Sequence, residues 1–308
     1  MPNAVVTSNY VGKLALPYVA PAILSADTIA NKYVQVRQNV PYKSVLRKMT
    51  GVGLQDASCA FSLPASNELT ISDVTLETKQ LKVNEEICNK ELREQWESEM
   101  MRSATSAAPG ELQSFAGQYI AQRVAEAVEL NLWQGDFNID GGLATSATYT
   151  DYPGIMRDIV LNNTGTTANL GGSLTASNII AKLAVLVGSA PNALKGDPEA
   201  RIYMSRTAKT LYHQALATTH GPFLNDSVVS MYAGYQIIAA AGFPDDVLLV
   251  SRPENLVFGT NLLSDMIQSA FVDLMGTTGS DSTRIVLQFA AGCKVIDQGS
   301  LYALYRTT

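Results

Sequence analysis

The clearest helical pattern of apolar positions lies between Glu111 and Trp133. The segment is rich in Ala, Glu, Gln and Leu, which favour helices. We expect a helix of 23 residues, about 35 Å long at 1.5 Å per residue, that ends at Gly135. Apolar side chains recur at every third or fourth position, as expected for one buried helix face: Leu112, Phe115, Ala116, Tyr119, Ile120, Val124, Ala127 and Val128.

The residues after position 42 predict a long β-hairpin. Its first strand is Lys43–Met49 and the return strand is Leu69–Val83. Apolar residues alternate in one phase up to Leu76 and in the opposite phase at Leu81 and Val83, which indicates a bulge or bend. At about 3.3 Å per residue the hairpin has a reach on the order of 50 Å. A two-stranded ribbon is marginally stable alone in water, so we expect this one to need a neighbour.

Residues 1–42 predict an extended arm, in which only Ser25–Lys32 suits a short helix. Such an arm is ordered only when something ties it down, and its many apolar side chains need a surface to cover. Prolines exclude a long helix there, at Pro2, Pro17, Pro21 and Pro41.

After the hairpin, Glu85–Met101 predicts an acidic amphipathic helix with Ile87, Leu92 and Trp96 on one side. Further on, short strands alternate with helices, which indicates an α/β or α+β unit. Thr175 or Ser177 suits the N-cap of a helix that carries apolar residues from position 179 to 187.

The second half of the chain predicts further strands. Ser205 caps a helix bearing Leu211, Tyr212, Ala215 and Leu216. In the last segments, alternation places Ile285, Leu287 and Phe289 on one buried strand face. The predicted strands are Arg201–Met204, Tyr235–Ala240, Val247–Val250, Val257–Phe258, Arg284–Ala290, Cys293–Asp297 and Leu301–Tyr305.

Composition indicates a globular chain with much of its surface covered by partners. Of 308 residues, 46% are hydrophobic and only 16% charged, against about a quarter charged in typical proteins. The net charge of −6 argues against a dedicated nucleic-acid binder with a basic fold. We find no apolar run long enough to span a bilayer and no signal peptide. The three cysteines fit neither a disulfide framework nor a zinc site, as expected in a reducing cytoplasm.

Charge is unevenly distributed along the chain. Residues 1–50 hold six Lys and Arg against Asp27, a net charge of +5, so the rest carries −11. A basic arm followed by an acidic stretch has two interpretations: pairing across subunits, or two solvated faces. The candidates for pairing are Lys13, Lys32, Arg37, Lys43, Arg47 and Lys48, with Glu91, Glu94 and Glu97 as acidic partners.

Residues with catalytic chemistry are sparse. The histidines are His213 and His220, and His213 lies in an apolar context that favours packing over general-base catalysis. We find no metalloprotease, nucleophile-elbow or P-loop motif. Residues 136–141 match the first half of an EF-hand calcium loop, but the twelfth position is Ala147 where a bidentate Glu is required. A turn is the favoured interpretation, and calcium there is the alternative. We predict no catalytic, cofactor or metal residues.

The order of these elements resembles the major capsid protein of tailed double-stranded DNA phages, the Hong Kong ninety-seven type. Stretches that look similar to this family are Leu81–Cys88, Leu132–Asp136 and Asn255–Leu262. The resemblance implies an α+β fold with five parts: an N-terminal arm at 1–42, an E-loop hairpin at 43–83, a P-domain at 84–149 with its spine helix at 111–133, an A-domain at 150–250, and return strands at 251–308 that complete the P-domain.

The resemblance implies a structural protein and not an enzyme. Copies would assemble into hexamers and pentamers of an icosahedral virion shell in the bacterial host cytoplasm. The partners would be the chain itself, scaffolding and portal proteins of the same phage, and packaged DNA held nonspecifically, with no cofactor and no membrane.

Two alternatives remain open at this point. One is a protein compartment of the same fold, similar to an encapsulin, that holds enzyme cargo. The other is an α/β enzyme centred on His213 or on the Asp136 loop.

Overall fold

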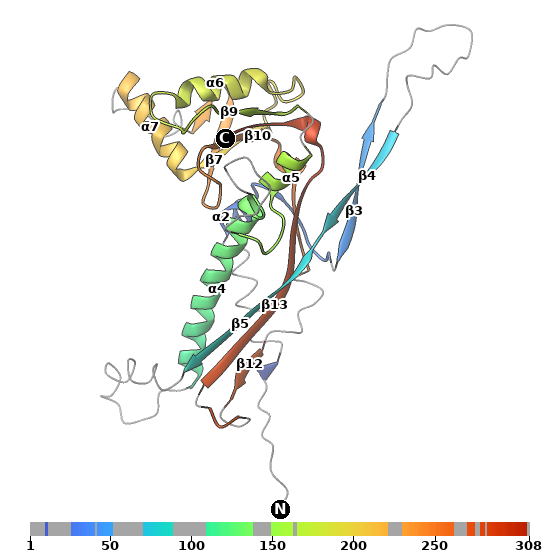
Figure 1. Ribbon diagram of the computed structural model, residues 1–308, viewed down its shortest axis with the longest axis vertical. Coiled ribbons are helices and arrows are strands. Elements are labelled where there is room, and N and C mark those ends of the chain that lie inside the picture. Colours follow the sequence, from blue (N-terminus) through green and yellow to red (C-terminus); the bar gives the residue numbers. More distant parts are fainter. Residues whose placement is uncertain are drawn as a thin grey trace, which may run out of the picture.

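The chain forms an elongated body with a hairpin that diverges from its side (Figure 1). A long helix and a long strand run through the lower body, and a smaller α/β lobe lies at the upper end. The computed structural model describes residues 10–11, 26–40, 42–51, 70–88, 109–137, 149–162, 165–220, 230–261, 270–274, 278–280 and 282–306.

The lower sheet is organised around one long strand, β13 (Ser282–Val295). β5 (Lys79–Cys88) pairs antiparallel with it, with Leu287 opposite Val83. The other neighbours follow in the order β1, β12, β13, β11, β2. Their bounds are β1 Tyr10–Val11, β12 Ala270–Asp273, β11 Leu256–Thr260 and β2 Gln35–Arg37.

The predicted spine helix is confirmed as α4 (Pro109–Gln134), which lies alongside β5 and β13 (Figure 1). Its buried face shares one core with the lower sheet, in which Ile285, Leu287 and Phe289 are buried as predicted. The helix contributes Ile120, Val124, Val128, Leu132 and Trp133 to this core.

The upper lobe is built on a second sheet in the order β6, β14, β10, β7, β9, β8. Side chains alternate between its two faces: Tyr203 joins the lower core, whereas Ile202 and Met204 join a second core beneath α6 and α7. The bounds are β6 Thr167–Asn169, α6 Ile179–Ser189, β7 Arg201–Ser205, α7 Arg206–His220, β8 Met231–Tyr232, β9 Tyr235–Ala240, β10 Val247–Ser251 and β14 Leu301–Tyr305.

A short helix, α5 (Ile155–Leu161), joins the two parts of the body. Its buried Asp158 accepts hydrogen bonds from the Val295 amide at 2.9 Å and from the Lys294 ammonium at 2.5 Å. These bonds fix the point at which β13 leaves the lower sheet. Two 3-10 turns, η1 (Pro253–Asn255) and η2 (Gln298–Ser300), lie between the strands of the two sheets.

The predicted hairpin forms from β3 (Lys43–Thr50) and β4 (Thr70–Glu77), paired from Lys43 opposite Glu77 to Thr50 opposite Thr70. The predicted bend is confirmed at Thr78, which is buried and separates β4 from β5. The hydroxyl of Thr78 lies 3.2 Å from the Tyr42 carbonyl oxygen, so the bend is held by the residue that precedes β3. The hairpin tip falls outside the described residues.

Several elements differ from the predicted ones. Glu85–Cys88 continue strand β5, where the sequence predicts the start of an acidic helix, because β13 offers them a hydrogen-bonding partner. The rest of that predicted helix lies outside the described residues. The two predicted strands 284–290 and 293–297 are the single strand β13, with Gly292 inside it. Helix α6 begins after Asn178, so neither Thr175 nor Ser177 is its N-cap.

Two predicted domain boundaries also change. Residues 26–40, the second half of the predicted arm, pack on the chain's own body: α2 (Asp27–Ala30) buries Ile29 and β2 pairs parallel with β11. The last strand, β14, pairs with β10 in the upper sheet instead of completing the lower one. By contrast, the Ser205 cap is confirmed, since its hydroxyl oxygen accepts a bond from the Ala208 amide at 3.0 Å.

Candidate assembly surfaces

The hairpin has one face on the body and one face in solvent. On the inner face, Leu46 and Leu76 are buried against Val40 and Val257. Further along the same face, the Lys48 ammonium lies 2.5 Å from a carboxylate oxygen of Asp297. The chain therefore covers the base of its own hairpin, whereas the sequence analysis expects a neighbouring molecule to cover the ribbon.

The outer face of the hairpin carries exposed apolar side chains. Met49 and Ile71 lie opposite each other, and they are 61% and 56% exposed. Val45, on the same face, is 56% exposed. Single exposed apolar residues are ordinary, but a row of them along one face of a projecting ribbon is typical of an interaction surface.

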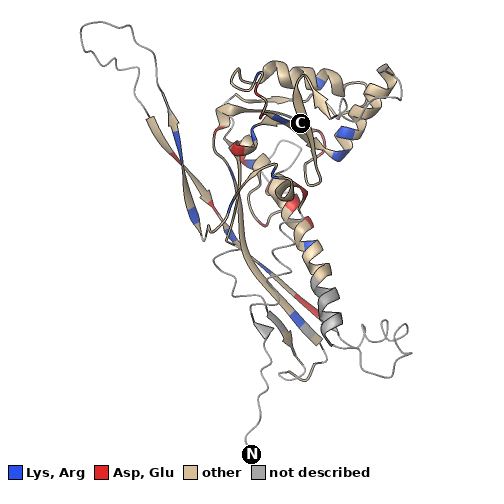
Figure 2. Cartoon of the chain, turned by 180° about the vertical axis from the view of Figure 1, so that it is seen from behind, with Lys and Arg blue, Asp and Glu red and all other residues tan. Residues whose placement is uncertain are grey.

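Ion pairs alternate with these apolar residues along the outer face. The Lys43 ammonium lies 2.6 Å from a carboxylate oxygen of Glu77, and Arg47 lies opposite Asp73 with 3.9 Å between their charged atoms. The hydrogen bond and charge of Glu77 raise the pKa of Lys43. Basic and acidic residues both lie along this ribbon in Figure 2. Along the hairpin the outer face therefore runs from the Lys43–Glu77 pair through Val45 and the Arg47–Asp73 pair to Met49 and Ile71.

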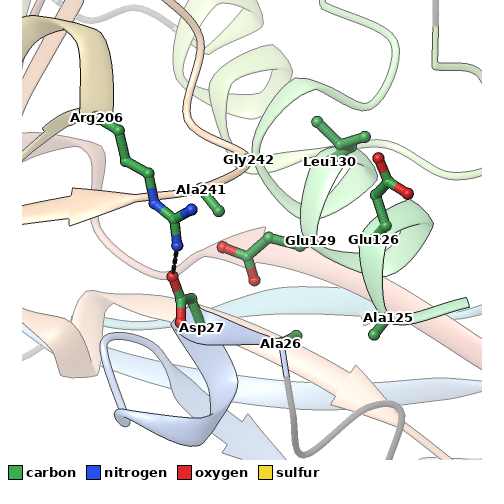
Figure 3. A pocket seen from close by; sticks show the side chains of 9 residues that line it. All are labelled: Ala26, Asp27, Ala125, Glu126, Glu129, Leu130, Arg206, Ala241 and Gly242. Carbon is green, nitrogen blue, oxygen red and sulfur yellow. Dashed lines mark hydrogen bonds and ion pairs between the residues drawn. The ribbon is translucent and has the colours of Figure 1, made fainter. Parts of the chain in front are cut away.

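A second feature is a pocket of about 380 Å³ where α2, α4 and α7 meet (Figure 3). Small residues form much of its wall, and Asp27 pairs with Arg206 across it. The carboxylate of Glu129 points into it from α4. The pocket is lined by Ala26, Asp27, Ala125, Glu126, Glu129, Leu130, Arg206, Ala241 and Gly242.

Glu129 is the buried acid of this junction, with only 4% of its surface exposed. Its two carboxylate oxygens accept hydrogen bonds from the amide of Thr28, at 3.2 Å, and from the hydroxyl of Thr28. Desolvation by burial outweighs these bonds and raises the pKa of Glu129. The sequence search missed this residue, although it lies one helical turn before Trp133 and thus on the buried side of α4.

The structure places the predicted interface residues in three groups. Lys43, Arg47 and Lys48 pair within the chain, as described above. Lys32 and Arg37 are exposed and make no ion pair with the described residues. The remaining candidates, Lys13, Glu91, Glu94 and Glu97, lie outside the described residues, so the proposed pairing of arm and acidic stretch stays a prediction.

The candidate catalytic and calcium residues lie apart from the pocket. His213 is partly buried on α7, next to Tyr212. Asp136 has a φ of 51° and lies 3.7 Å from Arg157 between charged atoms, as suits a turn, while the rest of the calcium-like loop is outside the described residues. Across the described parts of the chain, no group of three or more His, Cys, Asp and Glu residues is arranged to hold a metal.

In the same parts, none of the helices has the length and apolar character needed to cross a membrane. Comparison of the sequence with protein-family models gives no match. Comparison with curated proteins gives none either.

Solved structures, by contrast, match across nearly the whole chain. One is from the satellite phage P4 procapsid with size determination (Sid) protein, with a TM-score of 0.57, 12% identity, and coverage of 96% of this chain and 100% of that chain. Another is from the capsid of an empty GTA particle, with a TM-score of 0.57, 14% identity, and coverage of 93% and 90%. A third is from the capsid of Myoviridae phage XM1, with a TM-score of 0.54, 13% identity, and coverage of 91% of each chain.

These matches span the lower body, the hairpin and the upper lobe together. At 12 to 14% identity the likeness lies in the arrangement of elements and not in the sequence. The chain therefore has the α+β fold of phage capsid proteins, the Hong Kong ninety-seven type that its order of elements resembles.

Proposed function

We propose that this chain is a major capsid protein, which assembles with copies of itself into hexamers and pentamers of the icosahedral shell around a double-stranded DNA phage genome. The observation that carries the proposal is the outer hairpin face, with Val45, Met49 and Ile71 exposed on a ribbon that projects from the body. The likeness to subunits of assembled capsids supports a second copy of the chain as the partner that covers this ribbon.

Heterologous contacts between identical subunits close into rings. In such a ring the outer face of one hairpin lies on the next subunit, which buries its apolar row, with Val45 between the Lys43–Glu77 and Arg47–Asp73 pairs and with Met49 and Ile71 beyond the second pair. Each contact can be weak, because closure of the ring and the shell makes later contacts effectively intramolecular. Lys32 and Arg37, exposed on the packed part of the arm, are further candidates for contact with acidic residues of a neighbour.

The proposal extends to partners and location. The shell is assembled in the bacterial cytoplasm with scaffolding and portal proteins of the same phage, and it becomes the virion capsid. Packaged DNA contacts it without sequence specificity. A net charge of −6 suits this role, because a strongly basic lining would bind phosphates tightly. The chain has no catalytic role in this proposal.

Negative-stain microscopy of the purified protein, with light scattering at rising concentration, tests the proposal. We expect ring-shaped capsomers or closed shells. A protein that stays a monomer at millimolar concentration, with or without a coexpressed scaffolding protein, would contradict it.

A substitution on the hairpin tests whether its exposed outer face is an assembly contact. Met49→Asp places a charge in the exposed apolar row and should abolish assembly while the subunit remains folded. Met49→Leu keeps an apolar side chain at the same position and is the matched control. Assembly of the Met49→Asp variant at wild-type yield would show that the outer face is not an assembly contact.

A further inference from the structure

Residues 26–33 bridge the lower body and the upper lobe. Trp133 on α4 donates its indole N–H to the Thr28 hydroxyl oxygen at 2.9 Å, and Asp27 pairs with Arg206 at the start of α7. At the end of the segment, the Tyr203 hydroxyl donates to the Tyr33 carbonyl oxygen at 2.7 Å. One short segment therefore contacts both α4 and the upper sheet, and we call residues 26–33 the strap.

The hydrogen bonds of Thr28 converge on a buried acid. The Thr28 hydroxyl accepts from Trp133 and donates to Glu129, and the Thr28 amide donates to the second oxygen of the same carboxylate. Both polar hydrogens of Thr28, on the amide and on the hydroxyl, are therefore donated to Glu129. Glu129 is thus held by the strap on one side and forms part of the pocket wall on the other, with only 4% of its surface exposed (Figure 3).

We propose that the strap is a pH-sensitive clasp between the spine helix and the upper lobe, with Glu129 as its proton-binding anchor. When the strap is docked, Thr28 and its neighbours shield the Glu129 carboxylate from water. When the strap lifts, water reaches the carboxylate and its charged form is no longer penalised. Docking and proton binding at Glu129 therefore favour each other.

The direction of the effect follows from the buried state of Glu129. Desolvation raises its pKa in the docked form, although hydrogen bonds from Thr28 and from the Gly242 amide act in the opposite direction. The pKa returns toward its ordinary value when the strap is open. The full stability of docking is therefore present below the ordinary pKa of a glutamic acid and is lost as the pH rises through the raised value.

The other charged groups around Glu129 do not reverse this direction. Asp27, on the strap, adds negative charge that also raises the pKa of Glu129, and it is paired with Arg206 of α7. On α4 itself, Glu126 is paired with Arg123 at 2.9 Å. From the core side, burial raises the pKa of Tyr152 and of Cys293, so both are neutral at neutral pH.

Amide hydrogen exchange of the full chain tests the clasp. After correction for intrinsic exchange rates, we expect the protection of strap amides to fall as the pH rises from 4.5, the ordinary value for a glutamic acid, to 7.5, because the docked form binds the Glu129 proton more tightly than the open form. Amides of α6, which is remote from Glu129, serve as the internal control and should change less. Equal changes in the strap and in α6 would overturn the proposal, and this comparison needs only the wild-type chain.

Two variants assign the effect to one carboxylate. Glu129→Gln keeps the shape and removes the titration, so its strap protection should not change between the two pH values. Glu126→Gln, one helical turn away on the same pocket, should retain the wild-type change. A pH response of Glu129→Gln equal to the wild type would assign the titration elsewhere and overturn the proposal. Light scattering at each pH confirms that the samples compared share one assembly state.

Discussion

The ammonium group of Lys48 lies 2.5 Å from a carboxylate oxygen of Asp297, although 249 positions separate the two residues in the sequence. Lys48 belongs to the hairpin and Asp297 to the turn between β13 and β14. Asp297 is in turn fixed to the body, because the Asn255 side chain accepts from its amide at 2.7 Å and donates to its carbonyl oxygen at 2.8 Å. This pair therefore sets the direction in which the hairpin leaves the body.

We expect the Lys48–Asp297 pair to be worth about 1 kcal/mol of subunit stability, at the upper end of measured surface pairs, because both side chains are less than a third exposed. A double-mutant cycle with Lys48→Met and Asp297→Asn, followed by urea denaturation of the dispersed subunit, measures it. A coupling energy of zero would show that the pair does not stabilise the subunit.

Acid should weaken the same contact. Burial raises the pKa of Asp297, but hydrogen bonds from Lys48, Ser300 and the Gly299 amide outweigh it, so the net pKa is lowered. The stabilisation is therefore complete above the ordinary aspartate pKa, at about pH 4, and is lost as the pH falls through the lowered value. Unfolding curves below pH 4 should lose free energy more steeply for the wild type than for Asp297→Asn. Parallel losses would contradict this.

The close approach of β13 to the end of β4 depends on Gly292, which has no side chain. A Cβ atom added there would lie 2.1 Å from the Glu77 carbonyl oxygen, where the hairpin passes over β13. Gly292→Ala must displace backbone, so we expect a loss of about 2–4 kcal/mol in the free energy of unfolding, in the range of severe core changes.

A second glycine gives the control for that measurement. Gly188, in α6, has open space around its Cα. Gly188→Ala should therefore be neutral or stabilising by up to about 1 kcal/mol. Equal effects of the two substitutions in urea denaturation would mean that the crossing at Gly292 tolerates a side chain.

Local patterns predicted the elements whose own residues determine them. The face of Ile285, Leu287 and Phe289 and the spine helix follow from periodicity, and the Ser205 cap follows from the chemistry of one side chain. The bend after Leu76 was predicted from a change of phase alone. These features form on the chain without reference to distant segments, so the sequence carries their signal.

Features that depend on distant pairing escaped prediction. Glu85–Cys88 continue as strand because β13, some 200 positions away, supplies their hydrogen bonds. The same holds for the Lys48–Asp297 pair and for the docking of Thr28 on Glu129, 101 positions apart. An apolar arm has the same local sequence pattern whether it covers its own body or a neighbouring subunit. The packing of residues 26–40 on the chain's own body could therefore not be predicted from that pattern.

The two described cysteines should differ sharply in reactivity. Burial, with smaller contributions from the charges of Asp158 and Glu129, raises the pKa of Cys293 well above its ordinary value, and the residue is only 7% exposed. Cys88, at the end of β5, is exposed. Because the thiolate is the reactive form, iodoacetamide at pH 8 should modify Cys88 within minutes and Cys293 only after unfolding. Mass spectrometry of the two peptides checks this, and rapid modification of Cys293 would show that the lower core opens readily.

Opposite faces of strand β4 should separate folding from assembly. Leu76 is fully buried against the body, whereas Ile71 is 56% exposed on the outer face. Leu76→Ala should cost the dispersed subunit about 2–5 kcal/mol, as buried leucine truncations do. Ile71→Ala should change its stability by less than about 0.5 kcal/mol, as is usual at exposed sites.

The yield of assembled particles should respond to Ile71→Ala despite that small effect on folding. Under conditions where the Leu76→Ala subunit is still folded, light scattering should show weaker assembly for Ile71→Ala than for Leu76→Ala, since only the first removes surface that a neighbour covers. Stability losses of equal size in the two variants would mean that the outer face packs within the subunit. A reversed order of assembly yields would place the contact between copies elsewhere on the chain.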